Sequence, residues 1–112
     1  MRRDYRVYLD DILDSINKIE RYTKRISQKK FYKDTKTFDA VVRNLEIIGE
    51  AIKKAPDGVR SKHPDVEWKK IAGLRDILIH EYFGVDLEII WDIVKNKLPG
   101  LKPQIRKILR KK

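Results

Sequence analysis

Apolar residues recur every three or four positions along most of this chain, and that spacing leaves little choice of fold. From Asp4 to about Ser27 they form one stripe of a helix: Tyr5, Tyr8, Leu9, Ile12, Leu13, Ile16, Ile19, Tyr22 and Ile26. No segment alternates apolar and polar residues as a half-buried strand does. The sequence therefore predicts an all-α protein.

A second long helix is expected to run to about Ala55. Residues 28–34, QKKFYKD, are expected to form a polar, basic linker before it. Asp34, Thr35 or Thr37 could each cap its N-terminus. The sequence PDG at 56–58 is a turn signal that ends the helix, and the following VRSKHP is expected to form a connector or a single helical turn.

Three further helices are expected in the second half. Pro64 suits the first turn of a third long helix that stops near Gly84. Asp86 can cap a fourth helix, and LPG at 98–100 should break or kink it before a last helix.

Short links between long amphipathic helices imply antiparallel neighbours. We therefore expect an up-and-down bundle of four long helices with one or two short ones. At 112 residues, the chain has the size of one domain, so residues 1–112 are expected to fold as a single unit.

The charge is strongly positive, with 27 Lys and Arg against 17 Asp and Glu and a formal net charge of +10. Such a field favours a polyanionic partner, for which RNA, DNA or an acidic protein would all qualify. Residues 102–112, KPQIRKILRKK, form a basic tail without acids. This tail is either a solvated terminal helix or a direct nucleic-acid contact.

The absence of cysteine removes disulfides and cysteine metal sites, so a cytoplasmic protein is the default expectation. The N-terminal sequence MRRDYRVYLDD has no apolar stretch of signal-peptide length, and no uncharged run is long enough to span a bilayer. We expect no membrane association and no cofactor.

Candidate chemistry is concentrated in the run IAGLRDILIHEYFGVD, which contains Arg75, His80 and Tyr82. His63, directly before Pro64 in a connector, is not expected to be catalytic. A purely structural interpretation is equally open at this point. In it, Arg75 pairs with a neighbouring acid such as Asp76 or Glu81, while His80 and Tyr82 pack at a seam of the bundle.

These residue types suit RNA cleavage by the 2′-hydroxyl of the substrate. Imidazole has a pKa near neutrality and can move a proton, and guanidinium can hold the charge of a pentacovalent phosphate. His80 and Arg75 would fill these roles without a metal ion. Asp76 and Glu81 flank them as possible supporting residues, although neighbouring carboxylates on helices more often form surface pairs than metal sites.

One geometric difficulty concerns Arg75 and His80, because five residues turn an ideal helix by about 140°. Arg75 and Tyr82, seven residues apart, share a stripe more closely. A cleft between two copies of the chain, or a local distortion of the helix near Ile77, would each solve the problem. Pairing would also give a small bundle a deep cleft, so we expect a homodimer.

Glu46 and Glu50 lie four residues apart in the run RNLEIIGE. They are either surface ion pairs or buried polar groups that hold the helix carrying Arg75. A structural role is favoured over RNA binding, because two carboxylates would repel RNA unless arginine neutralised them.

Three stretches together resemble one family. They are VVRNLEIIGEAIKK, HPDVEWKKIAGLRD, and the run from IAGLRDILIHEYFGVD to LKPQI. In this order they resemble HepT-like proteins of the HEPN superfamily, whose mark is an arginine followed four to six residues later by histidine and then, in this branch, by x-Tyr. The resemblance covers nearly the whole chain.

The resemblance implies a metal-independent endoribonuclease toxin that forms a homodimer with its two motifs facing each other. Arg75 and His80 stand where the catalytic pair stands, and Tyr82 stands at the tyrosine of the motif. In this branch a neighbouring gene commonly encodes a minimal nucleotidyltransferase, which acts as antitoxin by adding AMP to that tyrosine. The role of Asp76, which occupies a variable polar position, stays open.

Two other functions stay in competition with this one. The chain could be a non-catalytic HEPN module that binds nucleotides or a nucleotidyltransferase partner. It could also be a basic helical protein that only binds nucleic acid. The intact Arg75, His80 and Tyr82 favour the ribonuclease.

Overall fold

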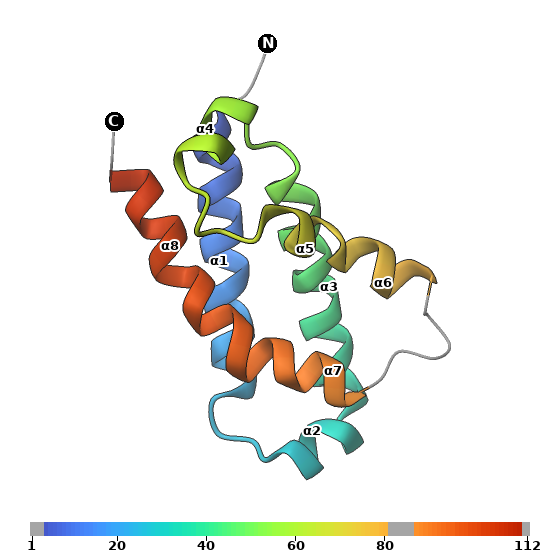
Figure 1. Cartoon of the computed structure of the whole chain (residues 1–112). Helices are drawn as coiled ribbons and strands as arrows, with labels where there is room; N and C mark the ends of the chain where they lie inside the picture. The colour runs from blue at the N-terminus through green and yellow to red at the C-terminus, as the bar shows by residue number, and fades with distance from the viewer. Residues whose placement is uncertain (1–3, 81–86, 111–112) are drawn as a thin grey trace.

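The computed structural model describes residues 4–80 and 87–110, apart from the side chains of Ile77, Ile79 and His80. The described part is helical and contains no strand, which confirms the predicted all-α bundle (Figure 1). Two short helices, α2 (Gln28–Lys33) and α4 (Asp57–Lys62), accompany four helical stretches. These stretches are α1 (Tyr5–Thr23), α3 (Thr35–Ile52), α5 (Trp68–Ala72) with α6 (Leu74–His80), and α7 (Leu87–Asp92) with η1 (Ile93–Lys97) and α8 (Leu98–Arg110).

The centre of the bundle is the contact between α1 and α3, with α8 lying along α1 and α5–α6 along α3 (Figure 1). At this contact, eight apolar side chains that follow the helical spacing each have at most 1% of their surface exposed. They are Leu9, Ile12, Ile16 and Ile19 of α1 and Val41, Leu45, Ile48 and Ile52 of α3. Burying side chains of this size contributes about 1.5–3 kcal/mol each, which makes this contact the main source of stability.

Capping residues set where the long helices begin. The Asp4 carboxylate accepts a hydrogen bond of 2.9 Å from the Arg6 amide at the start of α1. Asp34 does the same for α3. Its carboxylate accepts a hydrogen bond of 3.1 Å from the Thr37 amide and one of 2.8 Å from the Thr37 hydroxyl. Of the three predicted caps for the second helix, Asp34 is therefore the one used.

The predicted linker at residues 28–34 is wrong, because Gln28–Lys33 form the helix α2. Ser27 caps it by accepting a hydrogen bond of 3.1 Å from the Lys30 amide. Phe31 is fully buried, and its ring centroid lies 5.8 Å from that of Phe38 and 5.1 Å from that of Trp91. The fully buried Phe31 thus anchors this short helix, and the half-buried Tyr32 beside it also packs against the core.

Helix α3 ends at Ile52, before the predicted end near Ala55. The turn predicted at PDG is wrong, because Pro56 is the N-cap and Asp57 and Gly58 are the first residues of the short helix α4 (Asp57–Lys62). The segment after PDG thus supplies the single helical turn that was expected.

The third long helix, expected from Pro64, differs from the prediction. Residues 64–67 form turns in which Val66 is buried, and the indole of Trp68 donates 2.9 Å to the carbonyl of His63. Helix α5 starts only at Trp68.

Gly73 then separates α5 from α6, because its ψ of −13° departs from the helical value. Glycine has low helix propensity, so interrupting the helix at this residue costs little free energy. The predicted helix end near Gly84 and the predicted cap Asp86 lie outside the described residues.

The kink predicted at LPG occurs just before it. Residues Ile93–Lys97 form a π-helical turn in which the Leu98 amide bonds to the Ile93 carbonyl, five residues back. Leu98–Gly100 are the first turn of α8, and the chain changes direction between α7 and α8 (Figure 1). Pro99 has no amide hydrogen to donate, which disfavours an uninterrupted α-helix at this point.

Lys95 in this π-helical turn links it to the end of α1. Its ammonium group donates a hydrogen bond of 3.1 Å to the Thr23 carbonyl and lies 4.8 Å from the centre of the Trp91 ring. A cation at a helix C-terminus is favoured by the helix dipole. Lys102 on α8 adds a second link to α1, with its ammonium 2.7 Å from the Glu20 carboxylate.

Candidate functional site

Arg75 is the second residue of α6, and its side chain is 45% exposed. Its Nε lies 3.1 Å from Oε2 of Glu50 on α3. The structural interpretation of the sequence had expected a partner close to Arg75 in the chain, namely Asp76 or Glu81. Among the described residues, the acid that pairs with Arg75 is Glu50, 25 residues earlier, so this ion pair connects two helices.

At Gly49, next to Glu50, α3 comes close to the segment that carries Arg75. A Cβ placed on Gly49 would lie 3.2 Å from the Arg75 backbone nitrogen, 3.4 Å from the Arg75 Cβ and 3.5 Å from the Ile71 carbonyl oxygen. Glycine lets the two helices approach this closely. The backbone of Arg75 is thereby placed against α3, and Glu50 pairs with its side chain.

The sequence left two roles open for Glu46 and Glu50, surface ion pairs or buried polar groups, and the structure distinguishes them for Glu50. Glu50 is 53% exposed and forms a surface ion pair that connects α3 to the helix carrying Arg75. Glu46 is half-buried. The sequence reasoning did not identify Glu50 as the partner of Arg75. The one signal available was a glycine beside an acid on a helix that was expected to pack against the helix of Arg75.

His80 is the last described residue of α6, and its side chain lies outside the described part of the structure. Helix α6 is α-helical from Leu74 to His80, so the distortion considered near Ile77 is not seen. The turn of about 140° between Arg75 and His80 therefore remains. Glu81 and Tyr82 lie outside the described residues, and Asp76 is exposed beside Arg75.

His63 occupies the place expected of a connector residue. It follows α4, its side chain is half-buried, and its backbone carbonyl accepts the Trp68 indole hydrogen bond.

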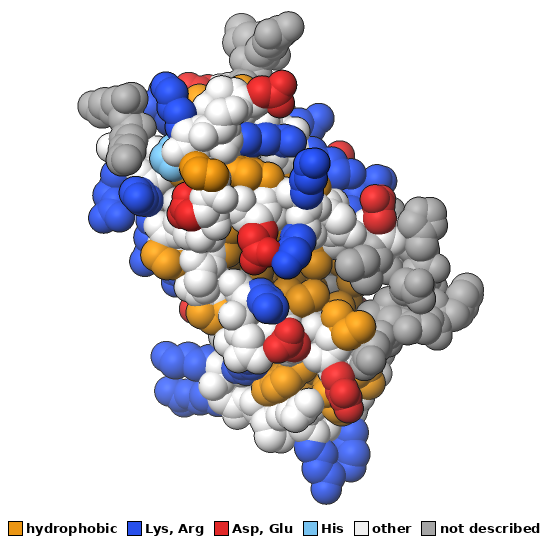
Figure 2. Space-filling view, viewed as in Figure 1, with side chains coloured by type: hydrophobic (Ala, Val, Ile, Leu, Met, Phe, Trp, Pro, Cys, Tyr) orange, Lys and Arg blue, Asp and Glu red, His pale blue; other side chains and the backbone are white. Residues whose placement is uncertain are grey.

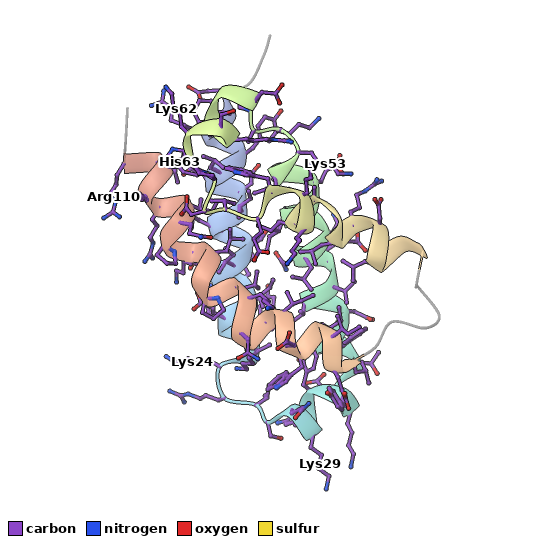
Figure 3. All side chains as sticks on the ribbon, viewed as in Figure 1. Lys24, Lys29, Lys53, Lys62, His63 and Arg110 are labelled. Atoms are coloured by element: carbon purple, nitrogen blue, oxygen red, sulfur yellow. The ribbon has the colours of Figure 1, made fainter. Side chains whose placement is uncertain are left out.

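On the face drawn in Figure 2, the described basic side chains are scattered and do not form one stripe. Figure 3 shows several of them extending outward from different ends of the bundle: Lys24, Lys29, Lys53, Lys62 and Arg110. On α8, Arg106, Lys107 and Arg110 are exposed, and Lys102 pairs with Glu20. The predicted basic tail is therefore mostly an exposed helical face as far as Arg110, and residues 111–112 lie outside the described part.

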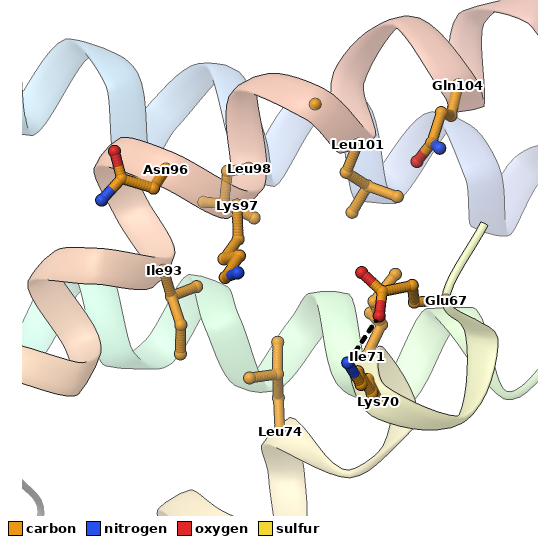
Figure 4. A pocket seen from close by; sticks show the side chains of 11 residues that line it. Glu67, Lys70, Ile71, Leu74, Ile93, Asn96, Lys97, Leu98, Leu101 and Gln104 are labelled. Carbon is orange, nitrogen blue, oxygen red and sulfur yellow. Dashed lines mark ion pairs between the residues drawn. The ribbon is translucent and has the colours of Figure 1, made fainter. Parts of the chain in front are cut away.

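A hollow of about 440 Å³ lies on the bundle between α5 and the η1–α8 segment (Figure 4). Ile71, Leu74 and Leu101 contribute apolar walls. At one side the Lys70 ammonium lies 2.8 Å from the Glu67 carboxylate, and this hydrogen-bonded pairing lowers the pKa of Glu67. Arg75 is not among the residues that line this hollow.

Comparison with known proteins identifies the family. Residues 12–108 match the family described as Ribonuclease HepT-like. The chain belongs to this HepT-like family, and its helical bundle agrees with the HEPN-like fold that the resemblance implied.

Three similar relatives illustrate the match. One is the "Probable ribonuclease HepT" of Thermococcus cleftensis, 44% identical over 96% of this chain and 98% of its own length. Another is a "Putative RNase" of Caldanaerobacter subterraneus subsp. tengcongensis, 48% identical over 95% of this chain and 95% of its own. A protein of Methanocaldococcus jannaschii, named "Gamma-glutamylcyclotransferase and putative RNase", is 49% identical over 97% of this chain. The chain spans only 49% of the length of that third relative.

No solved structure matches the chain significantly. Within residues 4–80 and 87–110, no helix combines the length and apolar character needed to cross a membrane. In the same residues, no three His, Asp or Glu side chains gather in a way that could hold a metal ion.

Proposed function

We propose that this chain is the RNA-cleaving toxin of a toxin–antitoxin pair and that it acts as a homodimer in the cytoplasm. The observation that carries the proposal is Arg75, exposed on helix α6, which also carries His80 five residues later, in a member of the HepT-like family. The names of the relatives point to ribonuclease activity in the same family.

The proposed reaction is attack of the RNA 2′-hydroxyl on the adjacent phosphorus. The bond from phosphorus to O2′ forms and the bond to O5′ breaks, which leaves a 2′,3′-cyclic phosphate and a 5′-hydroxyl. A proton leaves the 2′-oxygen and another is delivered to the 5′-oxygen. His80 would move a proton, and Arg75 would hold the charge on the pentacovalent phosphate.

A dimer would support this chemistry, because five residues turn an ideal helix by about 140° and Arg75 and His80 would not share one narrow stripe of it. Two copies related by a two-fold axis would line one cleft with both residues from both chains. Asp76 and Glu81 would stand at the edge of that cleft as supporting residues. The exposed cations of the surface would attract RNA from a distance.

The partner proposed for this toxin is a minimal nucleotidyltransferase that transfers AMP to the Tyr82 phenol. A bulky anionic group on Tyr82 would occupy the cleft and place a phosphate near Arg75, so RNA would be excluded.

The decisive experiment for the activity is incubation of the purified chain with RNA in excess EDTA. We expect cleavage to persist and the products to end in a 2′,3′-cyclic phosphate. Activity that disappears with the chelator, or products that end only in 3′-hydroxyl, would contradict the proposed reaction. A chain that binds RNA without cutting it would support the non-catalytic alternative.

A further inference from the structure

We propose that Glu50 is a positioning residue that orients the guanidinium of Arg75 toward the phosphate of RNA. The inference rests on the proposed function, because it assigns a role to a residue beside the proposed catalytic arginine. The Glu50 carboxylate and the Arg75 Nε, 3.1 Å apart, form the contact that carries it.

The atom used by Glu50 matters. A guanidinium carries five N–H donors, one on Nε and four on the two terminal nitrogens. Glu50 contacts Arg75 at Nε. The end of the guanidinium that bears both terminal nitrogens can then face a phosphate with two parallel hydrogen bonds.

The backbone around the pair is fixed on both sides. Glu50 lies on α3, whose other face is buried against α1, and Gly49 brings the Arg75 backbone into close contact with α3. A long arginine side chain on a surface otherwise samples many rotamers. A carboxylate held on the neighbouring helix reduces these rotamers and leaves the charged end exposed.

The exposure of the pair argues for orientation over stability. The two side chains are 45% and 53% exposed, and ion pairs in such surroundings contribute little to folding. Orientation of a catalytic group, by contrast, has large effects on rate, because a displacement of about 1 Å can reduce it about 100-fold.

The kinetic test compares Glu50→Ala with Glu50→Gln. The alanine variant removes the carboxylate, so we expect kcat on a short RNA to fall about 10-fold or more with KM changed less than about threefold. The glutamine variant keeps an oxygen that can accept from Nε, so most of kcat should return. Circular dichroism and thermal melting establish that both variants are folded.

Glu20→Ala is the matched control, because Glu20 also pairs with a cation on another helix, Lys102, at 2.7 Å. It removes the same charge and the same kind of helix-to-helix contact, and its kcat should stay within about twofold of wild type. If Glu50→Ala behaved like Glu20→Ala, the role of Glu50 would be structural and the proposal overturned. A rise in activity through lower KM in both Glu50 variants would also overturn it, because Glu50 would then act only by repelling RNA.

A spectroscopic readout separates this inference from the proposed function. The Nε–Hε signal of Arg75 in nitrogen-15 NMR is assigned by its loss in Arg75→Lys. We expect it to be protected from solvent exchange in wild type, in Glu50→Gln and in Glu20→Ala, and unprotected in Glu50→Ala. RNA should shift the signal in wild type. If wild type cuts no RNA, the proposed function fails, but protection of this signal by Glu50 together with its shift on RNA addition still supports orientation. An unprotected signal in wild type, or no shift with RNA, overturns it.

Discussion

The backbone nitrogen of Arg75 lies so near Gly49 that a Cβ on Gly49 would come within 3.2 Å of it. Contacts this short require a neighbour to move, and here the neighbour is backbone, which cannot turn aside as a flexible side chain can. The position of the proposed catalytic arginine therefore depends on a residue 26 positions earlier that has no side chain.

Gly49→Ala should destabilise the fold and slow RNA cleavage. Alanine is favoured over glycine in a helix by about 1 kcal/mol, but overpacking of this kind costs about 1–3 kcal/mol. We expect a net loss in the free energy of unfolding, measured by urea denaturation, and a lower kcat because Arg75 moves away from α3. The control is Gly58→Ala, where a Cβ would meet nothing within 4 Å, so stability should be unchanged or slightly higher. A gain in stability for Gly49→Ala would contradict the close approach.

Replacement of His80 by Ala should reduce the rate of RNA cleavage about 10²–10⁴-fold, the usual contribution of a general acid or base. Single-turnover cleavage of a labelled RNA measures this loss. His63→Ala is the control, because the contact that His63 makes with the Trp68 indole uses its backbone carbonyl and survives the substitution. An unchanged rate in the His80 variant would place the chemistry elsewhere.

Tyr82→Phe should retain its fold and escape the antitoxin, because the substitution removes the acceptor oxygen and keeps the ring. The measurement is intact mass after co-expression with the neighbouring nucleotidyltransferase. Wild type should gain mass in steps of one AMP, and the Phe variant should gain none. Equal modification of both proteins, or of neither, would refute the role of Tyr82.

Asp34 should make thermal stability depend on pH in the acid range. Hydrogen bonds from the Thr37 amide and hydroxyl lower its pKa from the ordinary value of 3.8. A lowered pKa means that the carboxylate stabilises the fold above its unfolded pKa, and that this contribution is lost as pH falls through the lower folded pKa.

The melting temperature of Asp34→Ala should accordingly lie below that of wild type at neutral pH, and the difference should shrink as the pH falls below 3.8. Asp34→Asn is the matched control, since asparagine can cap the helix without a charge. Its stability should vary less with pH over the same range. A difference between wild type and the alanine variant that stays constant on acidification would rule out a role for the charge.

Phe31→Ala should destabilise the protein by about 3–5 kcal/mol, because the side chain is fully buried against Phe38 and Trp91. Chemical denaturation gives the free energy, and Trp fluorescence reports the change beside Trp91. Tyr32→Ala provides a comparison on the same short helix, where the side chain is only half-buried and the loss should be smaller. Equal losses for the two variants would show that Phe31 does not anchor α2.

Several features of this protein followed from local sequence alone. The buried stripes of α1 and α3 were predicted because a helix repeats every 3.6 residues whatever it packs against. Asp34 was among three candidate caps because capping depends on the type of residue at the start of the helix, which is also local. Arg75, His80 and Tyr82 were chosen by residue type and spacing, and their proposed roles still await the experiments above.

Features that depend on distant residues required the tertiary structure. Helix α2 forms where a polar linker was predicted, because Phe31 meets Trp91 from the other end of the chain. The third helix begins at Trp68 and not at Pro64, because the residues before it form turns around the buried Val66. Gly73 then divides this helix into α5 and α6.

The environment of Arg75 shows the distinction most clearly. Its spacing from His80 was visible in the sequence, whereas its pairing with Glu50 was not. Helical periodicity is a local property of the chain, and it says which face of each helix is apolar. Which acid meets Arg75 is decided by the distance and rotation between α3 and α6, and those depend on how the whole core packs.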